Sequence, residues 1–188
     1  GFDIETTSPG EIDAARAAGI PNERLAYTCS DVSDEELLEV VRSGIRVHLD
    51  SLHQIAVVGR TLPGTDISVR LNQGIGAGHH AHVITGGPES KFGVDVVHVD
   101  ELSALAASYQ LRITGLHQHI GSNILDEKIF LEAMDVLAEN AHGFPDLTHL
   151  DFGGGFGVPY APEEKPLDIE TLGREVGARA ESFFKRYG

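Results

Sequence analysis

The chain has 188 residues, of which 41% are hydrophobic and 23% are charged, as in ordinary globular domains, and no apolar run is long enough to cross a membrane. Its 29 acidic and 14 basic residues give a formal net charge of −15, which repels phosphodiester backbones, so we expect neither a nucleic-acid nor a membrane partner. The single cysteine, Cys29, forms no intramolecular disulfide, and we expect a cytoplasmic protein.

The two ends of the sequence predict a piece of a longer protein. The chain begins at Gly1, without a methionine, inside a strand pattern, and it ends at Gly188 directly after a helical pattern. No basic and apolar leader opens it, so nothing in these residues predicts export.

Short β-branched or apolar runs alternate with amphipathic helical patterns along the chain. The predicted strands cover residues 2–6, 25–28, 46–49, 67–71, 113–119 and 149–152. The predicted helices cover residues 9–18, 33–43, 51–60, 100–108, 126–142 and 168–186. Ser33, with Glu36 three residues later, forms a capping box at the start of the second helix, which Gly44 closes.

Six strand-then-helix units in series, without a hairpin signal between them, predict parallel strands joined by helical crossovers. This alternation suits both a doubly wound sheet and a (β/α)8 barrel, and it does not separate the two. One irregular stretch, residues 72–99, is rich in glycine and histidine, and loops of that length in compact domains usually carry function.

One strand pattern runs directly into glycines at residues 150–157, Leu-Asp-Phe-Gly-Gly-Gly-Phe-Gly. Because Gly153, Gly154 and Gly155 have no side chains, they can bring backbone N–H groups close to an anion such as a phosphate. Val158 and two prolines then break any helix, so this is not the dinucleotide-binding motif. The alternative is a glycine turn that merely packs tightly.

The preceding strand pattern ends in a small, polar turn at residues 115–122, Gly-Leu-His-Gln-His-Ile-Gly-Ser. His117 and His119 share one face of this strand, since side chains two positions apart point the same way. They can be zinc ligands, a stacking or acid–base histidine with a supporting neighbour, or a satisfied core pair. Gly121 and Ser122 add a second phosphate-binding element. Two such turns on consecutive strands favour a phosphorylated cofactor over zinc, because phosphates bind at the mouth of such barrels.

Two further polar features lie in the middle of the chain. Arg70, at the end of a predicted strand, either orients groups near the mouth or forms a structural ion pair with Asp3 or Asp50. The histidine cluster at residues 79–82 lacks an acidic or thiol partner at a recognisable spacing, so we interpret it as loop surface and predict no metal site.

Four motifs occur together in the order found in the diaminopimelate decarboxylases. They are Phe-Asp-Ile-Glu-Thr at residues 2–6, Ser-Lys-Phe-Gly at 90–93, His-Gln-His-Ile-Gly-Ser at 117–122 and Asp-Phe-Gly-Gly-Gly-Phe-Gly at 151–157. The chain therefore resembles this family, which belongs to the alanine-racemase-like, ornithine-decarboxylase-like class of pyridoxal-phosphate enzymes. The resemblance implies an α/β fold, a (β/α)8 TIM-type barrel, here a partial barrel of about six βα units.

The resemblance also assigns roles around the cofactor, pyridoxal 5'-phosphate. It implies that His119, the one catalytic residue expected here, stacks on the face of the pyridine ring. It implies that Ser122 binds the phosphate and that Gly153, Gly154 and Gly155 supply backbone N–H donors to it.

The resemblance also implies residues with supporting roles, and it implies elements that this chain does not contain. By resemblance, Asp3 and Arg70 lie near the cofactor, and Lys91 is similar to an interface lysine. The Schiff-base lysine belongs on a strand before Phe2, outside this chain, and a glutamate turn and a C-terminal β domain belong after its last helix. We therefore expect residues 1–188 to be a pyridoxal-phosphate-binding barrel domain that is inactive alone. The resemblance implies a homodimer with the active site at the interface.

The function implied by the resemblance is decarboxylation of a small-molecule amino acid. The expected reaction converts meso-2,6-diaminopimelate to L-lysine and carbon dioxide, the last step of lysine biosynthesis. The alternatives are a biosynthetic arginine decarboxylase or an ornithine-type enzyme. Two alternatives belong to other functional classes. One is a non-catalytic barrel protein that binds pyridoxal phosphate, and the other is a zinc-dependent barrel hydrolase.

Overall fold

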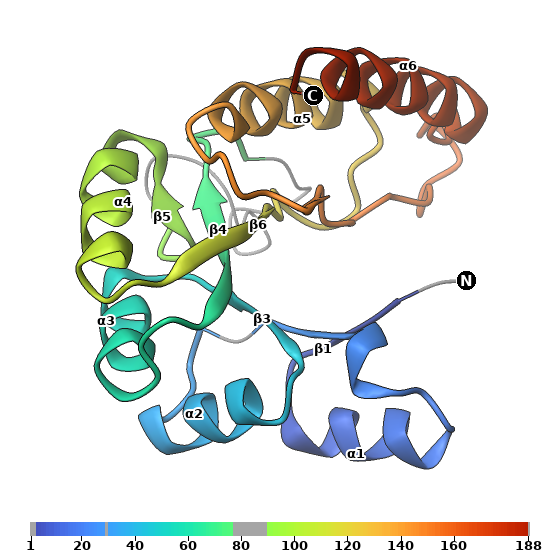
Figure 1. Ribbon diagram of the computed structural model, residues 1–188. Coiled ribbons are helices and arrows are strands. Elements are labelled where there is room, and N and C mark those ends of the chain that lie inside the picture. Colours follow the sequence, from blue (N-terminus) through green and yellow to red (C-terminus); the bar gives the residue numbers. More distant parts are fainter. Residues whose placement is uncertain (1–2, 29, 77–89, 188) are drawn as a thin grey trace.

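In the computed structural model, the strands form one curled parallel sheet with helices along its outer side (Figure 1). The structure describes residues 3–28, 30–76 and 90–187. The strands are β1 (Ile4–Thr6), β2 (Leu25–Tyr27), β3 (Arg46–Leu49), β4 (Asp66–Asn72), β5 (Val94–Asp95), β6 (Arg112–His117) and β7 (His149–Asp151). The helices are α1 (Pro9–Ala17), η1 (Asn22–Arg24), α2 (Asp34–Arg42), α3 (Leu52–Thr61), η3 (Val96–His98), α4 (Val99–Ser108), α5 (Glu127–Ala141) and α6 (Ile169–Tyr187).

The predicted elements form, and their ends differ from the prediction by no more than two residues. Local side-chain chemistry explains this agreement. The hydroxyl of Ser33 accepts a hydrogen bond from the Glu36 amide at 3.2 Å, as a helix N-cap should. Gly44 follows α2 with φ +78°, the left-handed conformation that ends many helices.

The strands lie in the order β1-β2-β3-β4-β6-β7, and each pair is parallel. A doubly wound sheet reverses its strand order partway, whereas this sheet follows the chain and curls in one direction, as a barrel does. The predicted partial barrel is confirmed. Strand β5 was not predicted, because two residues beside β4 are too short to show a periodicity.

The curled sheet has two free edges, β1 and β7. Among the described residues no strand pairs with the outer side of either edge. The opening between them is lined by Asp3 and Glu5 on one side and by Asp151 and Gly153 on the other. The inner face of the sheet is therefore reached through this opening and through the loops beyond the strand ends.

The outer face of the sheet is apolar and packs against the helices. Leu49, Val69 and Leu116 come from three adjacent strands, and each is completely buried in the same core as Leu102 of α4 and Leu137 of α5. Burial of each such side chain contributes about 1.5–3 kcal/mol. None of the described helices is long and apolar enough to cross a membrane.

The inner face of the sheet is polar, because residues alternate between the two faces. His48 pairs in register with Ser68, and Arg70 pairs with His117, so these four side chains point inward. Gly115, also inward, makes room for a ring on the next strand. A Cβ at that position would lie 1.9 Å from Nε2 of His149.

Candidate functional site

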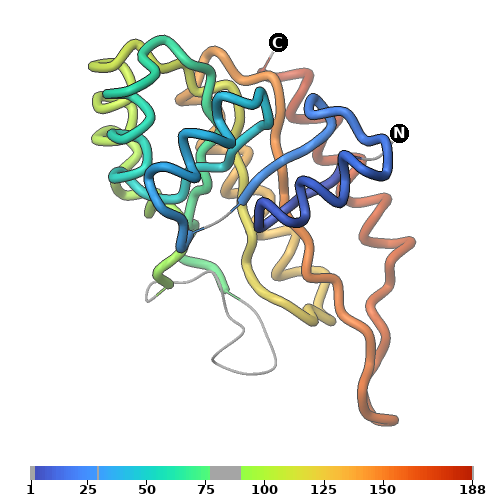
Figure 2. Tube along the Cα trace, turned by 90° about the horizontal axis from the view of Figure 1, so that it is seen from below, coloured from blue at the N-terminus to red at the C-terminus, as the bar shows by residue number. Residues whose placement is uncertain are grey.

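The turns after β6 and β7 lie side by side at one end of the sheet (Figure 2). The N–H of Gln118 donates to the carbonyl of Asp151 at 3.0 Å, and the N–H of Ile124 donates to the carbonyl of Gly155 at 2.8 Å. The N–H of Gly157 returns a bond to the carbonyl of Ile124 at 2.8 Å. These backbone bonds hold the two predicted phosphate-binding turns together as one unit.

Two glycines of the second turn are required by this close packing. Gly153 has φ +68° and Gly155 has φ +90°, conformations that other residues rarely adopt. A Cβ at Gly153 would lie 2.2 Å from the carbonyl oxygen of Gln118, and one at Gly155 would lie 2.0 Å from that of Gly121. At Gly154 a Cβ would meet no atom within 4 Å. Tight packing therefore explains the outer two glycines, and Gly154 borders open space.

The glycine turn keeps backbone donors that are not used within the described residues. In the part of the chain that the structure describes, the amides of Gly154 and Gly155 donate no hydrogen bond. The amide of Gly153 donates to Oδ1 of Asp151 at 2.8 Å, so it is already engaged. Ser122 is exposed on the neighbouring turn. Two free amides and a hydroxyl are the groups that bind a phosphate.

His119 lies in the turn after β6, because the strand ends at His117, two residues before its predicted end. The reason is that β7 ends at Asp151 and the chain turns away at Gly153, so the pairing of β6 with β7 stops at His117. Burial, and then the charge of Arg70, lower the pKa of His119, so the ring is neutral near pH 7. A neutral imidazole at this position can stack on an aromatic ring.

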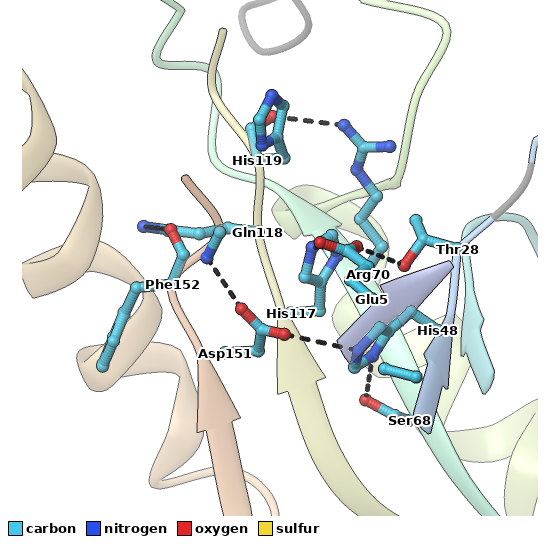
Figure 3. A network of polar contacts seen from close by, with 12 residues as sticks. Glu5, Thr28, His48, Ser68, Arg70, His117, Gln118, His119, Asp151 and Phe152 are labelled. Carbon is cyan, nitrogen blue, oxygen red and sulfur yellow. Dashed lines mark hydrogen bonds and ion pairs between the residues drawn. The ribbon is translucent and has the colours of Figure 1, made fainter. Parts of the chain in front are cut away.

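Arg70 extends from β4 toward the mouth and holds the turn after β6. Its Nη2 donates to the carbonyl of His119 at 3.2 Å (Figure 3). Its guanidinium carbon lies 5.1 Å from the ring centre of Phe92. Burial lowers the pKa of Arg70, and the charges of Asp50 and Glu5 oppose this change. Of the two predicted ion-pair partners, only Asp50 affects the pKa of Arg70, and within the described residues Arg70 forms a salt bridge with neither.

Asp3 precedes β1 and contacts other arginines. Its carboxylate lies 3.5 Å from Arg24 and 3.7 Å from Arg46, and its side chain is half exposed. It lines the opening between the sheet edges with Asp151. The two arginines hold its carboxylate, and the structure does not bring it to the serine and histidine of the first turn. Its supporting role at the cofactor stays a prediction.

A layer of polar side chains lies on the inner face, next to the turns, and within it His48, Ser68 and His117 are buried (Figure 3). The rings of His48 and His117 stack, with centroids 4.4 Å apart and planes at 19°. Nδ1 of His48 is 2.7 Å from the hydroxyl of Ser68, and Nε2 of His48 is 3.5 Å from Oδ2 of Asp151. Nε2 of His117 is 3.7 Å from Oε1 of Glu5.

Burial and mutual charge set the protonation of this layer. Burial first, and then the neighbouring charge of His48, hold the pKa of His117 well below its usual range. Burial, followed by Arg46 and His48, lowers the pKa of His149 to about 4. Burial alone would raise the pKa of Asp151, but His48, His117 and its bonded amide together hold it well below its usual range. Near neutral pH, an ionised Asp151 therefore lies beside uncharged His117 and His149.

Sequence reasoning missed most of the residues in this layer, which are Glu5, His48, Ser68 and Asp151. A signal was available, because polar residues occupy alternate positions along β3 and β4. That period of two places them on one face. The pattern does not say which residues of other strands they contact.

The histidines do not assemble a metal site in the described part of the chain. No group of three or more histidine, cysteine, aspartate or glutamate side chains there is placed to hold a metal ion. His79, His80 and His82 lie outside the described residues, as does Cys29. The zinc interpretation of the paired histidines on β6 therefore gains no support.

Comparison with known proteins decides the family. All 188 residues match the family model of the pyridoxal-dependent decarboxylases, pyridoxal binding domain. The chain belongs to this family. The cofactor predicted for this pyridoxal-binding domain, pyridoxal phosphate, is confirmed.

Curated relatives of this pyridoxal-binding domain are named diaminopimelate decarboxylase. The protein from Methanothermobacter thermautotrophicus is 40% identical over 100% of this chain and 45% of its own length. The protein from Aquifex aeolicus is 34% identical over 94% of this chain and 45% of its own length. The domain therefore spans about half the length of the curated relatives that it matches.

Solved structures show the same fold. Diaminopimelate decarboxylase from Helicobacter pylori, complexed with L-lysine, superposes with a TM-score of 0.84 at 28% identity, over 94% of this chain and 47% of that one. An arginine decarboxylase from Paramecium bursaria Chlorella virus superposes with a TM-score of 0.75 at 19% identity, over 97% of this chain and 48% of that one. At that identity the second likeness shows the fold alone.

The residues of this pyridoxal-binding domain fit its cofactor. Gly154 borders open space, and the free amides of Gly154 and Gly155 lie in the turn beside that of Ser122, an arrangement that suits a phosphate group. The neutral ring of His119 lies on the adjoining turn, where it can stack on a pyridine. The barrel mouth thus offers a phosphate cradle beside a flat ring surface.

Proposed function

We propose that this domain holds the cofactor of a diaminopimelate decarboxylase, which converts meso-2,6-diaminopimelate to L-lysine and carbon dioxide in the last step of lysine biosynthesis. The observation that carries the proposal is the 40% identity, over the whole chain, to a curated enzyme of that name. The joined turns after β6 and β7 support it, because they supply what a phosphorylated cofactor needs.

Each residue of the mouth then has a definite task. Gly154, Gly155 and Ser122 bind the phosphate, and His119 holds the pyridine ring flat. Arg70 fixes the backbone of His119 through its 3.2 Å hydrogen bond. When bound, the cofactor supplies a pyridine ring that accepts the electron pair released as carbon dioxide departs. The domain's own contribution is orientation of that ring.

The site is completed by residues outside this chain. We propose that residues 1–188 are the barrel domain, truncated at both ends, of a protein that also carries a Schiff-base lysine and a C-terminal β domain. The free edges of β1 and β7 support this, since a closed barrel needs further strands between them. The 45% coverage of the relatives agrees with it. The domain alone should release no carbon dioxide.

We also propose a cytoplasmic homodimer with the active site at the interface. Phe156, Val158 and Tyr160 follow the glycine turn and expose 49, 58 and 83% of their surfaces. An apolar segment in this position suits an interface beside the cofactor. Sedimentation equilibrium of the full-length protein, with and without a Tyr160→Asp substitution, tests the dimer. A monomeric wild type would contradict it.

The experiment that tests the function is carbon dioxide release by the full-length protein with pyridoxal phosphate. Three substrates are offered separately, namely meso-diaminopimelate, arginine and ornithine. Release from diaminopimelate alone is the expected result. Release from arginine or ornithine would keep the fold and cofactor but contradict the substrate. No release from any of them would favour a non-catalytic cofactor-binding protein.

A further inference from the structure

His48 is a buried side chain that joins two strands of the barrel interior. Its side chain is 0% exposed. Its Nδ1 lies 2.7 Å from the hydroxyl of Ser68 on β4, and its Nε2 lies 3.5 Å from Oδ2 of Asp151 on β7 (Figure 3). The ring thus bridges a hydroxyl and a carboxylate that are far apart in the sequence.

The second oxygen of Asp151 extends this bridge to the glycine turn. Oδ1 accepts a hydrogen bond from the amide of Gly153 at 2.8 Å. Gly153 is also the residue with φ +68° that packs against the carbonyl of Gln118. The carboxylate therefore links the buried ring of His48 to the backbone that positions the free amides of Gly154 and Gly155.

The charge of Asp151 orients this bridge. An ionised carboxylate only accepts hydrogen bonds, so Nε2 of His48 faces it as an N–H, at 3.5 Å, through an electrostatic contact that is longer than a hydrogen bond. Nδ1 of His48 and the Ser68 hydroxyl share one hydrogen bond at 2.7 Å.

His117 keeps the ring of His48 in this orientation. It stacks on His48 with only 19° between the planes, and it is itself almost completely buried. Because burial keeps His117 uncharged, it does not compete as a cation for the carboxylate of Asp151. The bridge is therefore held in one geometry before any ligand arrives.

We propose that Ser68, His48 and Asp151 form a positioning relay that fixes the glycine turn in the conformation that receives the cofactor phosphate. This inference rests on the proposed pyridoxal-phosphate site and identifies residues that set its affinity. A turn that is already ordered binds its ligand without the free-energy cost of ordering. None of the three relay side chains needs to touch the cofactor.

The relay affects only the binding of the cofactor's phosphate group. This distinguishes it from side chains that stabilise the fold as a whole. Breaking it should weaken binding of pyridoxal phosphate roughly fivefold to tenfold, the equivalent of about one net hydrogen bond. Binding of pyridoxal, which has the same ring without the phosphate, should be unchanged. A substitution that only loosens the barrel would weaken both ligands.

The test uses the full-length apoprotein, titrated with pyridoxal phosphate and with pyridoxal while absorbance is followed. Asp151→Asn keeps an acceptor for the Gly153 amide but removes the negative charge that attracts His48, and it should show the selective loss. His48→Gln carries an amide near the position of Nε2 and should bind nearly as the wild type does. His48→Asn carries its amide near Nδ1 only and should show the selective loss.

A matched control lies on the same strand. Val47→Ala removes a buried side chain from the outer face of β3, 7% exposed, and should lower stability without changing either affinity. Circular dichroism verifies that each variant is folded. If Asp151→Asn does not fold, the pair His48→Gln and His48→Asn still tests the relay.

The outcomes separate the relay from the function on which it rests. If the wild type binds pyridoxal phosphate and His48→Asn binds it equally well, the relay is wrong and the function stands. If the variants lose both ligands equally, the relay does not act on the phosphate turn and is also overturned. If the wild type binds no pyridoxal phosphate, the proposed function fails, and the relay fails with it.

Discussion

The two faces of the curled sheet have opposite characters, although they are built from the same strands. On β6, Leu116 points outward and is completely buried among apolar side chains, while its neighbour His117 points inward beside Arg70 and His48. The outer face stabilises the fold through burial of apolar surface. The inner face carries the groups that can bind and orient a ligand. Because successive residues of a strand point to opposite faces, one residue stabilises the fold while the next can contact the ligand.

The inner face costs stability. Both ring nitrogens of His117, Nε2 of His48 and Oδ2 of Asp50 are buried and make no hydrogen bond within the described residues. An unsatisfied buried polar atom costs about 1–3 kcal/mol. Burial of the apolar outer face offsets this cost. Polar side chains can therefore remain inside the barrel, next to the cofactor site.

The largest expected effect belongs to the outer face. Leu116→Ala leaves a cavity in the core between the sheet and the helices, and it should lower the free energy of unfolding by about 2–5 kcal/mol. Ser68→Ala, on the inner face of the adjacent strand, should lower it by less than about 1.5 kcal/mol. Urea denaturation of the full-length protein measures both. Equal losses would break the comparison between the faces.

The next effect separates two glycines of one turn. Gly153→Ala places a Cβ 2.2 Å from the carbonyl oxygen of Gln118 and should cost about 1–3 kcal/mol of stability. Gly154→Ala meets no neighbouring atom within 4 Å and should change stability by less than about 0.5 kcal/mol. Thermal unfolding without cofactor shows the difference. Equal unfolding temperatures for the two variants would contradict the packing described for this turn.

A smaller effect is expected at the mouth. His119→Ala removes the ring proposed to stack on the pyridine, which should weaken cofactor binding roughly twofold to tenfold and slow turnover in the full-length protein. Its effect on stability should be slight, because the side chain is only partly buried. Absorbance titration and steady-state rates measure the two quantities. Unchanged binding and kinetics would contradict the stacking assignment.

A further effect is a pH dependence of stability that comes from the inner face. The pKa of His149 falls from its ordinary 6.5 to about 4 in the folded protein, chiefly through burial. Between pH 4 and pH 6.5 the unfolded chain therefore binds more protons than the folded protein does. The contribution of neutral His149 to the free energy of unfolding should be fully present above pH 6.5 and should decrease as the pH is lowered toward 4. Urea midpoints across this range measure the decline.

His149→Gln is the variant that tests this origin. It should reduce the loss of stability at low pH without abolishing it, because the pKa of His117 is also lowered in the folded protein. A His149→Gln profile that coincides with the wild-type profile would show that the titration arises elsewhere.

The sequence by itself determined the elements and their order. Periodicity, the Ser33 cap and the closing glycine act over a few residues, so the strands and helices were readable within two positions. The glycine turn and the turn with Ser122 were also recognisable, because each is a short contiguous string. Strand β5 was not, since two residues carry no pattern.

Which side chains meet depends on the folding of the whole sheet. That His48 stacks on His117, that Asp151 joins His48 to Gly153, and that Asp50 rather than Asp3 affects the pKa of Arg70 all depend on the curl and register of the sheet. Such contacts link strands far apart in the chain, and no local periodicity encodes them. The sequence therefore specified a polar face, and the folding of the sheet turned that face into a site.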